Sequence, residues 1–272
     1  MNWRFVEHLG YPGAFHMAVD EMLLDRVGSG QSPPTFRVYT WTPPAISLGR
    51  SQRQGLRLDR KRCRHAGVDV VVRPSGGRAV LHGDDVTYSA VFPVDGVLGA
   101  GGVGVTYRRL AGLLLRALRF LGIEADLARS RASDRTQAAL PCFTAAARDE
   151  ILVGGRKLIG SAQRRTRTAV LQHGAILVRG DQADLASFVA DEEGAGSLRC
   201  SLAGRTVTVE EILGRSVSFA EVAWALNKAA GDVFDTEITY GELSQDEAAA
   251  IGESSGDESE VMGLSEASGS GT

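Results

Sequence analysis

The stretch from Arg73 to His82 (Arg-Pro-Ser-Gly-Gly-Arg-Ala-Val-Leu-His) combines residue types suited to binding a ligand. Its adjacent glycines, Gly76 and Gly77, allow positive φ angles and a close approach of the backbone to a bound group. Arg73 and Arg78 flank them with planar, permanently charged donors. Taken alone, residues 73–78, the glycine loop, favour an ordinary hairpin turn, because neither standard phosphate-binding motif is present.

The cysteines and histidines lack the spacing of metal ligands. Cys63, Cys142 and Cys200 form no C-x-x-C pair, and the five histidines are scattered along the chain. The pattern indicates neither a zinc site nor a disulfide framework, so no metal is expected. A free cysteine is commonly a small buried hydrophobe, and this interpretation is adopted for Cys63 and Cys200.

Lysine is rare in this chain. Of 30 basic residues only Lys61, Lys157 and Lys228 are lysines. A lysine among so many arginines can mark a position that needs a compact ammonium rather than a planar guanidinium, and Lys157 is the candidate. The alternative for Lys157 is a surface lysine at a hairpin turn.

Composition limits the protein class. A chain of 272 residues with 43% hydrophobic content is sufficient for one substantial domain. No apolar run approaches the ~20 residues of a membrane span, and the N-terminus has no signal-peptide layout, so a cytoplasmic protein is expected. Residues 252–272 carry five acidic and no basic residues and are predicted to be a disordered tail.

Charge is unevenly distributed. The whole chain has a net charge of −3, and without the tail's five acidic residues it has 30 basic against 28 acidic residues. This slight excess does not indicate nucleic-acid binding, which needs a concentrated basic face, but it fits an acidic protein partner. The predicted organisation is therefore a domain over residues 1–251 followed by the tail.

Hydrophobic periodicity indicates an α+β fold, a mixed β-sheet with packed helices. Strands are predicted at 3–6, 35–41, 45–49, 68–72, 79–92, 149–153, 156–162 and 169–178, and helical segments at 14–27, 57–65, 107–121, 219–230 and 247–251. The strands on either side of Gly154-Gly155 form a predicted hairpin. Asp20, inside the first helix, is predicted to be solvated or paired near the surface, with holding a nearby loop as the alternative.

Five segments together resemble the lipoate-protein ligase and octanoyltransferase superfamily. Besides Arg73–His82, these are His16–Glu21, Ile46–Gln52, Cys142-Phe143 with Gly155–Gln163, and Gln172–Leu177. Within the superfamily the chain looks most like the cysteine-dependent octanoyltransferases of lipoate biosynthesis. The resemblance implies a biotin/lipoate protein ligase-like catalytic domain. Val72 and Gly83 depart from the family pattern, which usually has an arginine and an acidic residue at these two positions.

The reaction implied by the resemblance moves octanoyl from acyl carrier protein to a lysine of a lipoyl domain, such as glycine cleavage H protein or an E2 subunit. Cys142 would be the nucleophile, because a thioester exchanges readily with a thiolate. Lys157 would lower the thiol pKa and steady the oxyanion. The resemblance assigns substrate binding to Arg73, Ser75, Gly76, Gly77, Arg78, His82, Gly160, Ser161, Ala162, His173 and Gly174. His82 and His173 could carry protons, but a hydrogen-bonded structural role is favoured for both.

No ATP, metal or other cofactor is implied for that reaction. Three alternatives remain open from the sequence. These are an ATP-dependent lipoate-protein ligase, an amidotransferase acting between lipoyl domains, and a lipoate- or acyl-binding relative without catalytic activity. Cys142 and Lys157 together argue against the last of these.

Overall fold

The computed structural model describes residues 2–52, 56–128, 150–234 and 238–251. The nucleophile candidate Cys142 and the predicted tail lie outside these ranges. A mixed eight-stranded sheet has the order β11-β1-β2-β6-β10-β9-β8-β7. Its strands are β1 (Trp3–Tyr11), β2 (Thr35–Trp41), β6 (Asp85–Pro93), β7 (Asp126–Leu127), β8 (Ile151–Val153), β9 (Arg156–Arg165), β10 (Ala169–Leu177) and β11 (Ile238–Tyr240).

A second, three-stranded sheet lies beside the first. Its order is β4 (Asp69–Val72), β3 (Ala45–Leu48), β5 (Val80–His82). β3 pairs parallel with β4 and antiparallel with β5, so the two strands that flank the glycine loop do not pair with each other. The prediction of an ordinary hairpin is therefore wrong, because β3 occupies the place between them. The predicted run 79–92 is likewise two strands in different sheets, separated at Gly83, whose φ is 144°.

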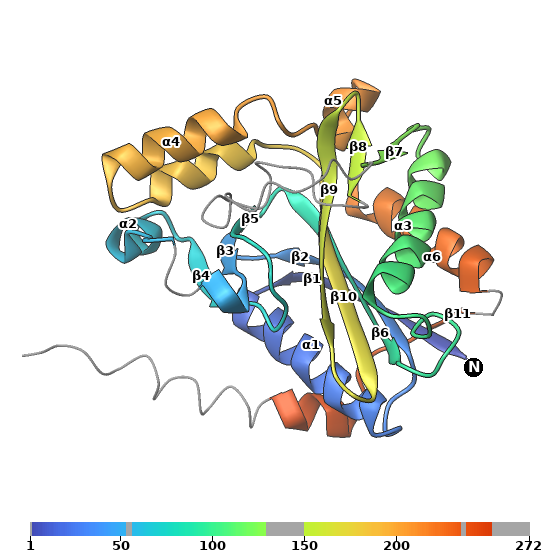
Figure 1. The fold of residues 1–272 in the computed structure, drawn as a ribbon. Coiled ribbons are helices and arrows are strands. Elements are labelled where there is room, and N and C mark those ends of the chain that lie inside the picture. The colour runs from blue at the N-terminus through green and yellow to red at the C-terminus, as the bar shows by residue number, and fades with distance from the viewer. Residues whose placement is uncertain (1, 53–55, 129–149, 235–237, 252–272) are drawn as a thin grey trace, which may run out of the picture.

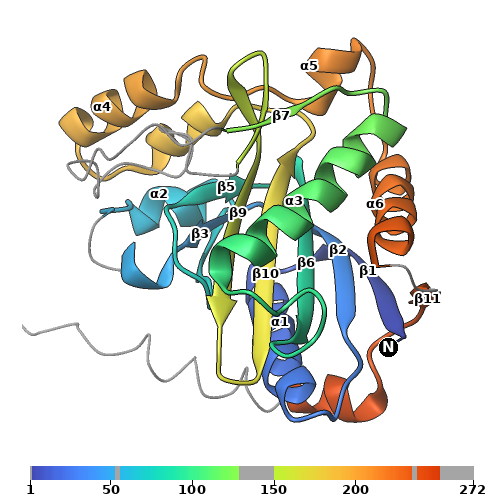
Figure 2. The same cartoon turned by 45° about the vertical axis from the view of Figure 1, so that its right-hand side comes forward.

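Two helices cover one face of the large sheet (Figures 1 and 2). They are α3 (Val103–Phe120) and α6 (Phe219–Phe234), which pack on each other and on Ile159, Val170 and Ile176. The leucines predicted for α3 recur at helical spacing, and Leu110, Leu113, Leu114 and Leu118 are all buried. This layer is the main hydrophobic core.

The other face of the large sheet carries α1 (Gly13–Gly28), whose Val19 and Leu23 pack on Val91 and Leu171. The small sheet completes this layer with α2 (Arg60–His65), α4 (Glu192–Leu202) and two 3-10 segments, η1 (Arg50–Gln52) and η2 (Gln182–Phe188). α5 (Val209–Leu213) leads into α6, and a helical segment spans 245–251. Within the described residues, no helix is long and apolar enough to cross a bilayer.

Local patterns predicted most of these elements correctly. α1, β2, α3, α6 and the β8–β9 hairpin are confirmed within a few residues. Gly154 and Gly155, with φ of 57° and 78°, make the turn of that hairpin. β10 is buried along its whole length because both faces of the sheet are covered.

Candidate functional site: a buried cavity beside the glycine loop

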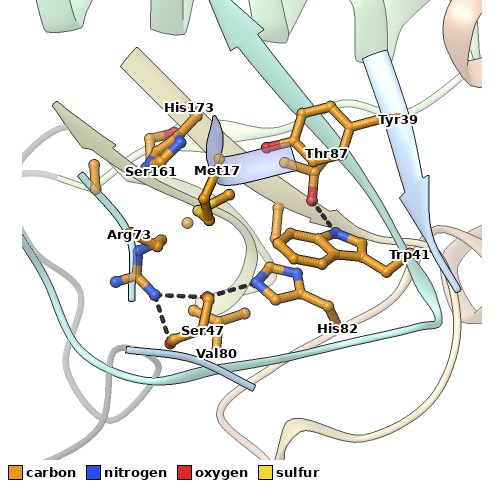
Figure 3. A pocket seen from close by; sticks show the side chains of 14 residues that line it. Met17, Tyr39, Trp41, Ser47, Arg73, Val80, His82, Thr87, Ser161 and His173 are labelled. Carbon is orange, nitrogen blue, oxygen red and sulfur yellow. Dashed lines mark hydrogen bonds between the residues drawn. The ribbon is translucent and has the colours of Figure 1, made fainter. Parts of the chain in front are cut away.

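A cavity of about 420 Å³, including its opening to solvent, lies between the two sheets. Its walls come from α1, β2, β3, β5, β6, β9, β10 and the glycine loop. Figure 3 shows Arg73, Ser47 and His82 joined by hydrogen bonds on one side, with His173 and Ser161 across the cavity. The lining residues are Met17, Tyr39, Trp41, Ser47, Arg73, Val80, His82, Thr87, Gly160, Ser161, Ala162, His173, Gly174 and Ala175. A mostly apolar cavity with a few converging polar groups is typical of a small-molecule site.

The glycine loop is held in shape by hydrogen bonds to its backbone carbonyls. The Arg73 guanidinium donates to the carbonyls of Gly76 (3.1 Å) and Arg78 (2.7 Å). The Ser75 carbonyl accepts from the N–H of Arg50 at 3.0 Å. Gly49 packs so closely that a Cβ there would lie 1.9 Å from the Gly77 carbonyl oxygen, so only glycine fits. The loop therefore has a defined shape rather than that of a free turn.

A buried chain of polar groups reaches the loop from α1. Asp20 Oδ2 lies 2.8 Å from His173 Nδ1, and His173 Nε2 lies 2.6 Å from the Ser75 hydroxyl. A carboxylate can only accept, so Nδ1 carries the proton and Nε2 accepts from Ser75. Burial lowers the pKa of His173, partly offset by Asp20, and the imidazole is neutral at pH 7.

Asp20 is itself part of a buried ion pair. Arg37 Nη1 donates to Asp20 Oδ1 at 2.7 Å, and both side chains are fully buried. Burial favours the protonated acid, but Arg37, His173 and the Ser89 hydroxyl outweigh it and lower the pKa of Asp20. Arg37 also donates to His16 Nδ1, and burial lowers the pKa of His16 to about 2. Asp20 was predicted to be solvated or paired near the surface; it is paired, but in the interior of the protein. Through His173 it also connects to the glycine loop, as the alternative expected.

A second chain reaches the loop from β6. Asp85 Oδ2 lies 3.0 Å from His82 Nδ1, and His82 Nε2 lies 2.7 Å from the Ser47 hydroxyl. Arg73 donates to the hydroxyl and the carbonyl of Ser47, each at 2.7 Å. Burial would raise the pKa of Asp85, but His82, the Thr87 hydroxyl and the Gly83 N–H lower it. The His82 ring stacks on Trp41 at 4.0 Å, which fixes its plane against the cavity wall.

The floor of the cavity consists of small residues from paired strands. Gly160 on β9 pairs with Ala175 on β10, and Ser161 with Gly174. A Cβ on Gly174 would lie 2.5 Å from the Gly160 carbonyl oxygen and 2.8 Å from the Tyr88 ring. These small side chains leave room for a ligand against the sheet, and a larger residue at Gly174 would clash with its neighbouring strands.

Lys157 is buried, with 3% of its side chain exposed. Its Nζ lies 2.5 Å from Glu150 Oε1, and Glu150 is buried as well. The interpretation of Lys157 as a surface lysine at a turn is therefore wrong. Lys157 lies three residues before Gly160 on β9, about 10 Å along the strand from the cavity floor.

The structure brings most of the predicted binding residues together. Arg73, His82, Gly160, Ser161, Ala162, His173 and Gly174 line the cavity, while Ser75, Gly76, Gly77 and Arg78 belong to the adjoining loop. Both imidazoles have both nitrogens engaged, which agrees with the favoured structural role. No cluster of His, Cys, Asp or Glu suited to a metal occurs within the ranges that the structure describes.

Sequence reasoning missed several residues of the site. Arg37, Asp85 and Glu150 carry its buried polar contacts but fit no motif, and Ser47 lies inside the family segment Ile46–Gln52 without having been singled out. For Asp20 a signal was available, because His16, Asp20, Leu23 and Val27 recur at the i, i+4, i+7 spacing of a buried helix face.

Comparison with known proteins gives the family of this chain. The family described as lipoyl protein ligase A/B catalytic domain matches residues 12–231. The chain belongs to the lipoyl protein ligase A/B family. The superfamily resemblance inferred from the five sequence segments is thereby confirmed.

Curated relatives of this family match almost the whole chain. Octanoyltransferase LipM of Carboxydothermus hydrogenoformans is 36% identical over 245 residues, covering 89% of this chain and 90% of that protein. Octanoyltransferase LipM of Moorella thermoacetica is 36% identical over 249 residues, covering 90% and 91%.

Solved structures share the fold. Protein Ta0514 of T. acidophilum, a lipoate protein ligase structure with bound lipoic acid, superposes with a TM-score of 0.72 at 22% identity, covering 93% of this chain and 94% of that chain. A lipoate-protein ligase A structure bound with ATP gives 0.74 at 21% identity, with the same coverage. The expected α+β ligase-like fold is confirmed by these similarities.

Proposed function

We propose that this member of the family is an octanoyltransferase of protein lipoylation. Its curated relatives are octanoyltransferases at 36% identity over about nine-tenths of the chain. The cavity supports this function, because it joins an apolar, small-residue floor to a loop that carries backbone N–H groups. The family match over residues 12–231 supports one catalytic domain over residues 1–251.

The proposed reaction has two acyl transfers. The Cys142 thiol loses its proton and attacks the octanoyl thioester of acyl carrier protein as a thiolate, and pantetheine leaves as a thiolate that takes up that proton. The amine of a lipoyl-domain lysine then attacks the Cys142 thioester, forming an amide and regenerating the thiol. Each step exchanges one acyl bond for another, so the reaction needs neither ATP nor a metal.

The described residues would supply positioning and electrostatics. The apolar chain would lie against Gly160, Ala162, Gly174 and Ala175, and the glycine loop would receive the thioester. Lys157 would stabilise the oxyanion of the tetrahedral intermediate. Its partner Glu150 neutralises part of that charge and lowers the cost of burying an ammonium there.

Transfer of octanoyl from octanoyl-acyl carrier protein to a purified lipoyl domain, without ATP, tests the proposal. The acceptor should gain one octanoyl unit on its lysine, and Cys142→Ala should abolish the transfer. Cys200→Ala is the matched control, because Cys200 is an exposed free cysteine, and it should transfer at the wild-type rate. Transfer by Cys142→Ala at full rate would rule out the thioester mechanism.

The nearest rival, an ATP-dependent lipoate ligase, has its own signature. It would exchange pyrophosphate into ATP when given free lipoate, with no need for Cys142. We expect no such exchange, and exchange without octanoyl transfer would move the assignment to a ligase. An amidotransferase would instead take octanoyl from one lipoyl domain and pass it to another.

A further inference from the structure

The glycine loop is tied to the body of the protein by two chains of the same construction. In each chain an aspartate holds the Nδ1 side of an imidazole, and a serine hydroxyl meets Nε2. The Asp20–His173–Ser75 chain has distances of 2.8 and 2.6 Å, and the Asp85–His82–Ser47 chain has 3.0 and 2.7 Å. The first ends on the loop itself, while the second ends on β3 and passes through Arg73 to the loop carbonyls.

The order Asp–His–Ser is also that of an activated serine nucleophile. Burial argues against that use here. Ser75 is 1% exposed and Ser47 is fully buried, so neither hydroxyl can reach a protein-bound acyl group without a rearrangement. Ser47 in addition accepts from Arg73, which fixes its oxygen. The hydroxyls are therefore placed to hold the loop rather than to attack a substrate.

We propose that His173 and His82 are positioning residues, which set the backbone of the glycine loop for the acyl thioester through Ser75 and through Ser47 with Arg73. This inference rests on the proposed function. Each aspartate accepts from the Nδ1 side of its imidazole, and in the neutral His173 this leaves Nε2 as the acceptor that the Ser75 proton needs. Loss of either imidazole removes the short hydrogen bond of a buried serine hydroxyl and releases one side of the loop.

The surroundings keep the His173 imidazole in this state. His173 meets Asp20 from α1 and Ser75 from the loop, with the charge of Arg73 nearby. Asp20 is balanced by Arg37 from β2 and by the Ser89 hydroxyl from β6. Such a network is costly to bury unless every member is satisfied, which agrees with a network that serves a site.

The direct test is hydrogen exchange of the loop peptide that contains residues 74–78, compared between wild type, His173→Ala, His173→Gln and Ser75→Ala. Faster exchange is expected in His173→Ala and Ser75→Ala. Exchange near the wild-type rate is expected in His173→Gln, because a glutamine oxygen can accept from Ser75. His65→Ala is the matched control, since His65 lies exposed on α2, and it should change nothing. Because exchange needs no activity, this readout stands even if the protein is not an octanoyltransferase.

Kinetics separate positioning from acid–base catalysis. Acyl transfer by His173→Ala should fall about 100-fold, the cost of a misplaced reacting group, with at least tenfold recovery in His173→Gln. Alkylation of Cys142 by iodoacetamide should keep its wild-type rate and pH profile in both variants. A shifted pH profile of alkylation would make His173 the base that deprotonates the Cys142 thiol, and so would contradict a positioning role. Hydrogen exchange of the loop that is unchanged in both Ser75→Ala and His173→Ala would also overturn the proposal.

A double-mutant cycle tests whether the two chains act on one loop. Ser75→Ala and Ser47→Ala each remove only one oxygen, so both variants are expected to fold. If both chains hold the same loop, the loss of transfer rate in the double variant should differ from the product of the single losses by at least threefold. Independent losses would show that the chains do not share the loop as their target.

Discussion

The two faces of the large sheet are built in opposite ways. Under α3 and α6 the contacts are mostly apolar, with Leu114, Ile159 and Ile176 as typical members, and the few polar contacts there join neutral groups such as Tyr107 and Ser161. Under α1 the sheet buries a charged pair, Asp20 with Arg37, and beside it the neutral His173. The first face stabilises the fold by removing apolar surface from water, whereas the second incurs a desolvation cost for every charge that it buries. The cavity opens on the second face, so the costly contacts lie where the function is expected.

The largest effect is expected from breaking the buried charge pair. Arg37→Met leaves the Asp20 carboxylate buried without its guanidinium and should lower the free energy of unfolding by about 3–5 kcal/mol. Urea unfolding followed by circular dichroism measures this loss. Adding Asp20→Asn to Arg37→Met should cost less than the sum of the single changes, since the pair is then removed as a unit. A loss below about 1 kcal/mol in the single variant would contradict a buried pair.

A substitution that creates a void on the apolar face should lower the free energy of unfolding without affecting the functional site. Leu114→Ala removes a fully buried side chain between α3 and α6, and the expected loss is about 2–5 kcal/mol. Octanoyl transfer at 20 °C, below the unfolding transition, should stay within about twofold of wild type. A much larger drop in transfer with folded protein would show that the two faces are coupled.

The neutral histidines predict how stability depends on pH. His16, with a pKa of about 2, remains unprotonated in the fold while the unfolded chain takes up protons below about pH 6.5, and the lowered pKa of His173 acts in the same direction. Stability is therefore fully present above about pH 7 and falls with acidification, by about 1.4 kcal/mol per pH unit for His16, with a further loss from His173. Thermal unfolding between pH 7.5 and 5.5 measures this slope.

Two variants sharpen the pH prediction. His173→Gln should reduce the slope, whereas His65→Ala on exposed α2 should leave it unchanged. Asp20 and Asp85, whose pKa values are lowered, stabilise the fold as carboxylates. That stabilisation is lost only at lower pH, as the two groups protonate. A flat stability profile from pH 7.5 to 5.5 would mean that the histidines are not held neutral.

The smallest effect is expected from a surface pair. Arg116 and Asp232 join α3 to α6 at 2.7 Å, but half of the arginine side chain is exposed. Solvent screens such a pair, so Arg116→Ala should change the free energy of unfolding by less than about 1 kcal/mol. A loss as large as that of Arg37→Met would remove the distinction between buried and exposed charge.

The apolar face was largely predictable from sequence, because its signals are local. The leucine spacing of α3 and the Gly-Gly turn between β8 and β9 each lie within a few residues of the feature that they predict. α4 was missed because it lacks such a local signal. Its eleven residues contain two glycines and bury only Leu198 and Leu202, so it has little periodicity to read.

The polar face could be predicted only in part. The glycine loop was found from its residue types and the strand of Gly160–Ala162 from the local pattern, but their place in one binding site was found only through the resemblance to a family. The partners of His173 and Ser75 lie 153 and 98 positions away along the chain, and no local pattern pairs residues at such separations. The small sheet was misread because β3, which precedes the loop in sequence, pairs between the two strands that flank it.

The most direct test of the Cys142 thioester mechanism is the intact mass of the purified protein after mixing with octanoyl-acyl carrier protein, without ATP. We expect a gain of one octanoyl unit, which peptide mapping places on Cys142 and which disappears when a lipoyl domain is added. An unmodified protein that instead exchanges pyrophosphate into ATP with lipoate would contradict it, and would make the cavity the site of a ligase.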